Sequence, residues 1–197
     1  KKSEFIASSI NYIGAGTIEY LYDPYTSEYF FMEMNTRIQV EHPVTEMITG
    51  YDLVRNQILC HANISLSKEK LNSIKLRGHS IECRINAENT KNNFMPCPGE
   101  ITSFHLPGGN GIRIDTHAYA GYIVPPNYDS MIAKIVVYGD TRLEAISRMS
   151  GALDECVIEG IDTTIPLHKF ILRDKDFIDG NFDTNYLEKL IKEKYNV

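Results

Sequence analysis

Five polar side chains recur at alternate positions between residues 33 and 41, where the sequence reads EMNTRIQVE. In an extended chain successive side chains point to opposite faces, so alternate residues share one face. The spacing therefore predicts one face that carries Glu33, Asn35, Arg37, Gln39 and Glu41. Such groups can bind ions and move protons, but the solvated face of a half-exposed strand shows the same alternation. The spacing alone leaves both interpretations open.

Two strand-like segments precede and enter this polar stretch. Residues 17–22 and 28–34 are rich in β-branched and aromatic residues, and the polar segment between them is typical of a hairpin loop. A hairpin centred on Thr26 places Glu19 directly opposite Glu33. Two carboxylates opposite each other repel, at a cost of about a few tenths of a kcal/mol or more. The predicted hairpin therefore needs positive charge between these two side chains.

A divalent cation would supply that charge. Carboxylate oxygens and an Asn carbonyl are ligands that Mg²⁺ accepts, and protein-bound Mg²⁺ usually accompanies nucleotide phosphates. Glu19, Glu33 and Asn35 together offer such a ligand set. Arg37, two residues further on, would hold an anion beside the metal through its planar guanidinium. The residues thus point to chemistry on a phosphate or another small anion.

Helical patterns flank the predicted hairpin. Isoleucines at positions 6, 10 and 13 share a helical face and predict a helix that ends at the glycines near residue 14. The segment 36–44 has no regular pattern, and Thr45 and Asp52 are both good helix N-caps. Residues 53–62 then read as a helix, and the polar segment 65–75 marks a domain boundary.

The second half of the chain predicts a β-rich unit with helices. In 79–88 four small or apolar residues alternate with polar ones, which indicates a half-buried strand whose inner face carries Ile81, Cys83, Ile85 and Ala87. Shorter strands are expected at 100–105, 111–115 and 131–138. Thr141 and Glu144 form a capping box for a helix whose apolar stripe is Leu143, Ile146, Met149 and Leu153. Residues 163–194 are mainly helical by pattern, and the fold class is α+β.

Composition excludes several classes of protein. The chain has 197 residues, 43% of them hydrophobic, with a formal charge of −6, so it lacks the basic excess that nucleic-acid binding requires. No apolar run approaches the roughly 20 residues that cross a bilayer. Four scattered cysteines without a C-x-x-C pair fit reduced thiols and a cytoplasmic protein. We therefore expect no nucleic-acid partner and no membrane.

Several long segments resemble the biotin carboxylase family of the ATP-grasp superfamily. They are EMNTRIQVEHPVTEMITG from residue 33, GHSIECRINAEN from residue 78, PGGNGIRIDTHAYAGYIVPPNYDSMIAK from residue 107, and GIDTTIP from residue 160. The resemblance implies that residues 1–75 are the C-terminal part of an incomplete ATP-grasp domain, an antiparallel hairpin plus helices. Residues 76–197 would be the β-rich C-terminal domain with flanking helices.

The resemblance also implies a chemistry and a role for each matched residue. In this family ATP and bicarbonate form carboxyphosphate, and the CO₂ released is captured by biotin on a biotin carboxyl carrier protein. Two Mg²⁺ or Mn²⁺ ions with ATP would be held by Glu19, Glu33 and Asn35, with Glu33 bridging the ions. Glu41 would be the base that deprotonates bicarbonate. That anion would be bound by Arg37, Gln39, the main-chain N–H of Val40, and Arg84. Biotin would be bound by Arg84 and Arg37, the latter stabilising its enolate.

The same resemblance implies partners and leaves alternatives. Pyruvate carboxylases tend to read N-P-R and E-H-T where this chain has NTR at 35–37 and EHP at 41–43, which favours a bacterial acetyl-CoA carboxylase and fatty acid synthesis. Carboxyltransferase subunits and a homodimer, with Arg113 at its interface, would follow. The alternatives are a propionyl-CoA, methylcrotonyl-CoA or pyruvate carboxylase, a non-catalytic dimerisation module, or another ATP-grasp ligase acting on an amino acid or carbamoyl precursor.

Some expectations concern what this chain would not do. No glycine-rich phosphate loop precedes the hairpin, so we expect the isolated 197-residue chain to be inactive. His42 is expected to make a structural hydrogen bond rather than to transfer protons. Asp129 is expected to have a structural or interface part. The other histidines lie far from one another in sequence and are not expected to bind metal.

Overall fold

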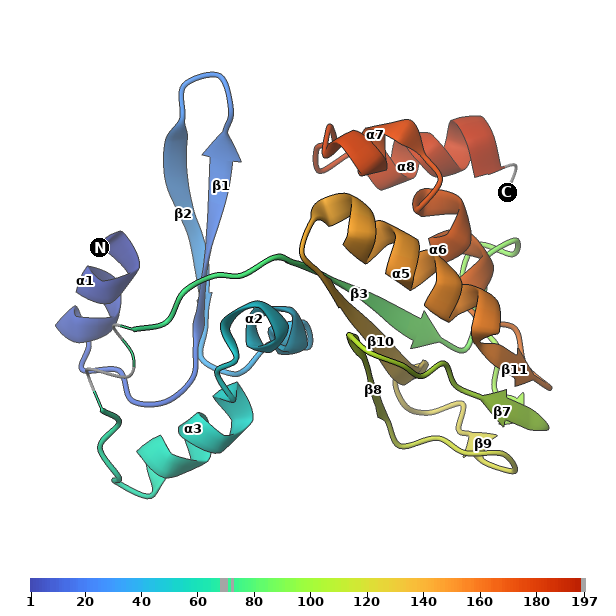
Figure 1. The fold of residues 1–197 in the computed structure, drawn as a ribbon, viewed down its shortest axis with the longest axis horizontal. Helices are drawn as coiled ribbons and strands as arrows, with labels where there is room; N and C mark the ends of the chain where they lie inside the picture. The colour runs from blue at the N-terminus through green and yellow to red at the C-terminus, as the bar shows by residue number, and fades with distance from the viewer. Residues whose placement is uncertain (68–70, 72, 196–197) are drawn as a thin grey trace. The chain divides into compact units, whose positions relative to one another are not determined.

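A computed structural model describes residues 1–67, 71 and 73–195, and it divides the chain into two compact units, residues 1–76 and 77–197. Both units mix helices and strands, in agreement with the α+β class. The first unit contains α1 (Lys2–Ser9), β1 (Thr17–Asp23), β2 (Glu28–Asn35), α2 (His42–Thr49) and α3 (Leu53–His61) (Figure 1). No helix in the described ranges is long and apolar enough to cross a membrane.

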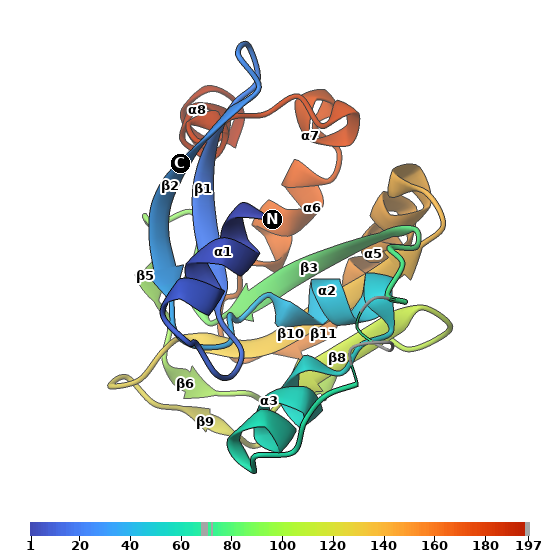
Figure 2. The same ribbon diagram turned by 90° about the vertical axis from the view of Figure 1, so that its left-hand side faces the viewer.

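The strands β1 and β2 form an antiparallel hairpin that extends as a long twisted ribbon (Figure 2). Glu19 pairs with Glu33, so the predicted juxtaposition of the two carboxylates is confirmed. A bulge after Glu19 shifts the register, so that Tyr20 pairs with Phe31 and not with the residue directly before Glu33, which a regular ladder would give it. The predicted centre at Thr26 therefore holds only for the pairs formed by residues 17–19, on the side of the bulge away from the turn. Bulges insert one residue and leave no periodic mark in a sequence.

The chain leaves the extended conformation at Asn35, where β2 ends. The predicted common strand face is therefore wrong beyond Asn35. The next helix, α2, begins at His42 with Glu41 as its N-cap, so Thr45 lies inside the helix and is not a cap. Pro43 sits in the first turn, where its missing N–H costs nothing and its fixed φ favours a helix start.

The other two helices of the first unit differ in how well their ends were predicted. The cap of α3 is confirmed, because Asp52 Oδ1 accepts a hydrogen bond of 2.7 Å from the main-chain N–H of Arg55. In contrast, α1 ends at Ser9 and not at the glycines. Asn11 follows with a φ of 50°, and Ile13 is 64% exposed. The isoleucine stripe has no core to pack against, so it does not extend the helix.

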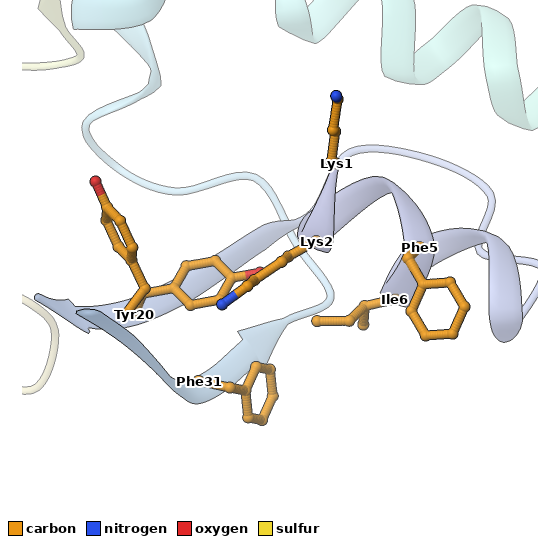
Figure 3. A pocket seen from close by; sticks show the side chains of 7 residues that line it. Lys1, Lys2, Phe5, Ile6, Tyr20 and Phe31 are labelled. Atoms are coloured by element: carbon orange, nitrogen blue, oxygen red, sulfur yellow. The ribbon is translucent and has the colours of Figure 1, made fainter. Parts of the chain in front are cut away.

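The first unit has little core of its own. Among its described residues only Pro43 is buried. An open cavity of about 470 Å³ lies between α1 and the hairpin, and its walls include Ile6, Tyr20 and Phe31 together with Lys1 and Lys2 (Figure 3). The rings of Tyr20 and Phe31 meet edge to face with centroids 6.4 Å apart. These apolar side chains therefore lie close together but remain accessible to solvent.

The second unit is built on a three-stranded antiparallel sheet with β10 between β3 and β8. Its strands and helices, several visible in Figure 1, are β3 (His79–Asn86), β4 (Glu88–Asn89), β5 (Met95–Pro96), β6 (Gly99–Glu100), β7 (Ser103–His105), β8 (Ile112–Thr116), β9 (Ile123–Val124), β10 (Met131–Gly139), α5 (Arg142–Glu155), β11 (Val157–Glu159), α6 (Ile165–Ile171), α7 (Lys175–Asp179), α8 (Tyr186–Leu190) and the π-helical turn η1 (Ile191–Tyr195). The short strands pair as β4 with β5, β6 with β9, and β7 with β11.

A compact core lies between this sheet and α5, which packs against β10 and β3. Ile85, Ile135, Met149 and Leu153 are all 0% exposed. The predicted inner face of β3 is confirmed, and burial raises the pKa of its Cys83 to about 12, so that thiol stays protonated in the core.

The predicted stripe of α5 is confirmed at three positions and wrong at the fourth. Leu143 is 63% exposed, because the face that packs on the sheet also uses Ala145 and Ala152. Thr141 caps the helix by accepting a hydrogen bond from the N–H of Glu144 at 3.2 Å. The Glu144 side chain binds the N–H of Asp140, one residue before the one that a reciprocal capping box uses.

Candidate functional site

Four polar side chains converge at the lower end of the β1–β2 hairpin. Glu19 Oε1 accepts hydrogen bonds from Asn35 Nδ2 at 2.8 Å and from Gln39 Nε2 at 2.7 Å. Asn35 Nδ2 also donates to Glu33 Oε1 at 3.1 Å. The hairpin register brings Glu19 and Glu33 together, and the turn after β2 carries Gln39 back to them. We call these four residues the hairpin cluster.

In the hairpin cluster, amide N–H groups donate to the two carboxylates and so offset the repulsion between them. A single amide nitrogen of Asn35 lies between two carboxylates, in the position where the sequence predicts a cation. An Asn side chain offers nitrogen donors on one side and an oxygen acceptor on the other, so the same residue can present its oxygen to a metal ion. Glu19, Glu33 and Asn35 thus fit a hard divalent cation, which prefers oxygen ligands.

The described residues offer only these two carboxylates at this point. No group of three His, Cys, Asp or Glu side chains in ranges 1–67 and 73–195 is arranged to hold a metal ion. Beside these two carboxylates, a cation at the hairpin cluster would have the Asn35 amide oxygen and would need further oxygen ligands. Phosphate oxygens are the ligands with which Mg²⁺ is usually shared.

The predicted anion-binding residues of the first unit are divided between the hairpin cluster, which contains Gln39, and the turn that follows β2. Arg37 is exposed, and its Nη1 donates to the carbonyl of Ile38 at 3.3 Å. Val40 lies in the turn before α2, and Glu41 is the exposed N-cap of that helix. The structure brings Gln39 to Glu19, but the described contacts do not bring Arg37 or Glu41 to the carboxylates.

His42 holds the main chain of this turn. Its Nδ1 lies 2.9 Å from the carbonyl oxygen of Gln39, and its main-chain N–H donates to the same oxygen at 3.2 Å. Its Nε2 lies 4.0 Å from the carboxylate of Glu46. The expected structural hydrogen bond is therefore present, and it fixes the residue whose side chain reaches Glu19.

A cavity of about 320 Å³ opens beside this turn, and its walls include Gln39, Glu41 and Gly14. Gly14 has a φ of +113°, and a Cβ there would lie 2.9 Å from Nε2 of His61. Only glycine fits this position without strain. A water occupies about 30 Å³ in the liquid, so the cavity has room for a small polyatomic anion.

Arg84 belongs to the second unit and lies on the polar face of β3. Its cross-strand neighbour on β10 is Lys134, which in turn pairs with Asp115 on β8. Lys134 Nζ lies 3.7 Å from Asp115 Oδ2, and Arg113 binds the same carboxylate through Nε at 2.8 Å and Nη2 at 2.9 Å. Arg113, predicted at an interface, therefore makes an ion pair within its own unit.

Lys134 and Asp115 were missed by the sequence analysis. They join Arg84 in one row across three strands, and that row exists only once the strands have paired. The one signal in the sequence is a lysine inside the otherwise apolar run MIAKIVVY. A charge at the centre of a central strand has to lie on a polar face.

Comparison with known proteins decides the family. The family model described as biotin carboxylase C-terminal domain matches residues 82–189. The chain belongs to the biotin carboxylase family. Residues 1–69 match the model described as carbamoyl-phosphate synthase L chain, ATP binding domain, which places this biotin carboxylase segment in the ATP-grasp family.

Individual relatives agree with this assignment. The chain is 56% identical over 182 residues to biotin carboxylase 1 of Bacillus subtilis, and it is 50% identical over 183 residues to a pyruvate carboxylase subunit from Methanothermobacter thermautotrophicus. The alignments cover 92% and 93% of this chain, and 40% and 37% of the two relatives. The chain therefore spans about two fifths of the length of the biotin carboxylases that it matches.

A solved structure agrees as well. The biotin carboxylase domain dimer of the Hydrogenobacter thermophilus 2-oxoglutarate carboxylase, in complex with MgADP, ADP and bicarbonate, superposes with a TM-score of 0.88 at 49% identity. The match covers 93% of this chain and 40% of that chain.

Proposed function

We propose that this chain is part of an ATP-dependent ligase that carboxylates biotin with bicarbonate. The proposal is supported by membership of the biotin carboxylase family and by one observation above all. Two carboxylates, Glu19 and Glu33, face each other across a hairpin with an amide between them. A fold that needed only stability would avoid this arrangement, since opposed like charges destabilise a ladder.

The hairpin cluster would hold the metal ions that accompany ATP. Glu19 and Glu33 would bind two Mg²⁺ or Mn²⁺ ions together with the Asn35 amide oxygen, and Glu33 would bridge the ions. The metal supplies positive charge to the phosphates of the nucleotide. The amide nitrogen of Gln39, which donates to Glu19, carries a second N–H that would donate to the anion.

The turn before α2 would bind and activate bicarbonate. Glu41 would take the bicarbonate proton, and the anion would be held by Arg37, Gln39 and the main-chain N–H of Val40. Arg37 suits this task because its planar guanidinium matches a carbonate edge and remains charged at any working pH. It would also stabilise the enolate that biotin forms when N1 loses its proton, before N1 captures CO₂, and preorganised donors of this kind often make the largest contribution to catalysis.

Arg84 would meet the ureido oxygen of biotin and the bicarbonate. It is the exposed member of the row with Lys134 and Asp115, in which the carboxylate of Asp115 is shared by Lys134 and Arg113. The guanidinium of Arg84 would direct its own positive charge and N–H donors toward an anionic or polarised oxygen.

The biotin would be attached to a carrier protein, and carboxyltransferase subunits would receive the carboxyl group. We infer a cytoplasmic homodimer. We further infer that it serves acetyl-CoA carboxylase, because the motifs NTR at 35–37 and EHP at 41–43 differ from the N-P-R and E-H-T that pyruvate carboxylases tend to have. A 2-oxo acid acceptor such as pyruvate is a second candidate, and it is favoured by the 50% identity to a pyruvate carboxylase subunit. The acceptor would be chosen by the carboxyltransferase, and both candidates use the same first half-reaction.

The test is ADP release by the full-length protein, with bicarbonate present and free biotin added or omitted. We expect biotin to stimulate ATP cleavage. The variant Arg37→Ala should lower turnover by about 10²- to 10³-fold with little change in the KM for ATP, because the lost contact is made mainly in the transition state.

The matched control is Arg55→Ala, an exposed arginine on α3 in the same unit, which should leave both constants unchanged. ATP cleavage that ignores biotin would contradict the proposed function. Normal turnover in the Arg37 variant would remove that residue from the mechanism and leave the reaction class standing.

A further inference from the structure

The main chain of Arg84 is held from outside its sheet. The strand β3 lies at the edge of the order β3-β10-β8, so one of its sides has no partner strand among the described residues. Alternate residues of a strand point their N–H and C=O groups to the same side, so Arg84 and Asn86 share one side. An edge strand leaves such groups without a partner unless another element supplies one.

Thr164 supplies three of the bonds on this side. Its hydroxyl donates to the carbonyl of Arg84 at 3.0 Å and accepts from the N–H of Asn86 at 3.0 Å. Its own main-chain N–H donates to the carbonyl of Asn86 at 3.1 Å. Thr164 is only 6% exposed, so these bonds are shielded from water. One residue thus completes the edge of β3 where a neighbouring strand would otherwise do so.

His168, in the last turn of the short helix α6, binds the same carbonyl. Its Nε2 lies 2.8 Å from the carbonyl oxygen of Arg84. A carbonyl only accepts, so Nε2 carries the hydrogen and donates it. Desolvation by burial lowers the pKa of His168, which keeps the ring neutral and uncharged against the strand. The carbonyl of Arg84 therefore receives two donors, one to each of its lone pairs.

The opposite side of β3 becomes irregular just after this point. The ladder between β3 and β10 shifts register between Met131 and Ala133, one pair beyond the pair formed by Arg84 and Lys134. A bulge interrupts the ladder there. The bonds from Thr164 lie on both sides of this shift, because they hold Arg84 before it and Asn86 after it.

We propose that Thr164 and His168 are positioning residues for Arg84, and that α6 and its N-cap set the place from which the Arg84 guanidinium reaches biotin. The inference rests on the proposed function, because that function gives Arg84 its substrate. An arginine is a long side chain, so a small shift of its main chain is carried to its tip. Misplacement of about 1 Å at a reacting group lowers rates by about 10²-fold in other enzymes.

The primary experiment compares Thr164→Val with Thr164→Ser in the full-length protein. Valine has the same shape but no hydroxyl, whereas serine keeps it. We expect the valine variant to raise the KM for free biotin by about tenfold or more while the KM for ATP stays constant, since the nucleotide residues lie in the other unit. The serine variant should behave as the wild type does.

The matched control is Thr116→Val. Thr116 also bridges two main-chain groups, one in β10 and one just after β8, because its hydroxyl donates to the carbonyl of Ile132 at 2.7 Å and accepts from the N–H of Ala118 at 3.0 Å. Its loss should lower the melting temperature, by less than the loss at Thr164 because Thr116 is exposed, and should not change the KM for biotin. Equal changes in KM for the Thr164 and Thr116 variants would show that Thr164 acts through stability alone, and would overturn the inference.

A second pair of variants covers the case in which Thr164→Val does not fold. His168→Gln keeps an N–H donor at a similar reach, and His168→Ala removes it. We expect a raised KM for biotin only in the alanine variant. In that case an unchanged KM in both histidine variants would overturn the inference.

A crystal structure separates this inference from the proposed function. Absence of biotin-dependent ATP cleavage in the wild type would overturn the function. In that event the guanidinium of Arg84 should still be displaced in Thr164→Val or His168→Ala and undisplaced in their conservative counterparts. The same guanidinium position in all four variants would overturn the positioning role, whatever the activity.

Discussion

The two units of this chain differ in where their apolar side chains lie. The second unit buries a continuous core between its central sheet and α5, with Ile85, Ile135, Met149 and Leu153 at 0% exposure. The first unit buries only Pro43 among its described residues, and its hairpin exposes Phe30 by 53% and Phe31 by 56%. The unit with the hairpin cluster thus has the weaker basis for its own stability.

This difference separates what folds the protein from what carries its chemistry. Apolar burial contributes about 25 cal/mol for each Å² removed from water, and the first unit gains little of it within itself. The hairpin cluster is held instead by local hydrogen bonds to Glu19 and by the turn that His42 fixes. Such contacts define geometry well, but each is worth only about 1 kcal/mol net.

The largest expected effect is on folding of the separated units. We expect residues 77–197 to unfold cooperatively in urea when produced alone, because their core is internal. Residues 1–76 alone should show no cooperative transition in circular dichroism, because Pro43 is the only one of their described residues that is fully buried. A sharp transition for residues 1–76 would break the comparison between the units.

Single substitutions test the same contrast at the level of side chains. Ile135→Ala removes a fully buried side chain from the centre of β10 and should lower the free energy of unfolding by about 2–5 kcal/mol. Phe31→Ala removes a larger side chain from the hairpin but should cost less than about 1 kcal/mol, since Phe31 is 56% exposed.

Urea titrations of the 197-residue chain measure both changes. Val157→Ala, at 44% exposure, is the control within the second unit and should resemble the hairpin variant. Equal losses for Ile135→Ala and Phe31→Ala would mean that the hairpin is packed as tightly as the core.

Local patterns predicted the elements whose two faces differ strongly. The strand β3 and the stripe of α5 follow from alternation and helical spacing, because each has one buried face. The pair formed by Glu19 and Glu33 agrees with the hairpin arithmetic, although the pairs next to the turn lie one residue out of that register and the bulge after Glu19 restores it. Where a segment has no core, as in α1, spacing overestimated the length of the helix.

The rest depends on contacts that a sequence does not reveal. Thr164 bonds to Arg84 across 80 positions, and Lys134 meets its neighbours only through strand pairing. The turn of Gln39 back to Glu19 could not follow from an extended-strand pattern, because β2 ends before it. Each of these contacts joins a polar side chain to a residue elsewhere in the chain that holds it in place. The periodicity of a sequence carries no information about such contacts.

A metal titration sharpens the comparison at the hairpin cluster. In the full-length protein, Glu33→Gln should raise the Mg²⁺ concentration needed for half-maximal ATP cleavage by about tenfold, because one charged ligand is lost and an amide of the same shape remains. Glu28→Gln, at the exposed far end of the same strand, is the control and should leave the metal requirement unchanged. Equal metal dependence in both variants would exclude Glu33 as a ligand.

The smallest expected effect is a pH dependence confined to the second unit. Burial lowers the pKa of His168. Between the folded and the unfolded pKa values, the unfolded chain therefore binds a proton at this residue and the folded chain does not. The stabilisation is complete above the unfolded pKa of about 6.5, and it is lost progressively as the pH falls below that value until the folded pKa is passed.

His168→Gln cannot titrate, so the free energy of unfolding of residues 77–197 should fall less in this variant than in the wild type between pH 7 and 5, by on the order of 1 kcal/mol or less. The other histidines are present in both proteins and cancel in the difference. Parallel curves would mean that His168 is as accessible to protons in the fold as in the unfolded chain, and that its bond to Arg84 opens freely.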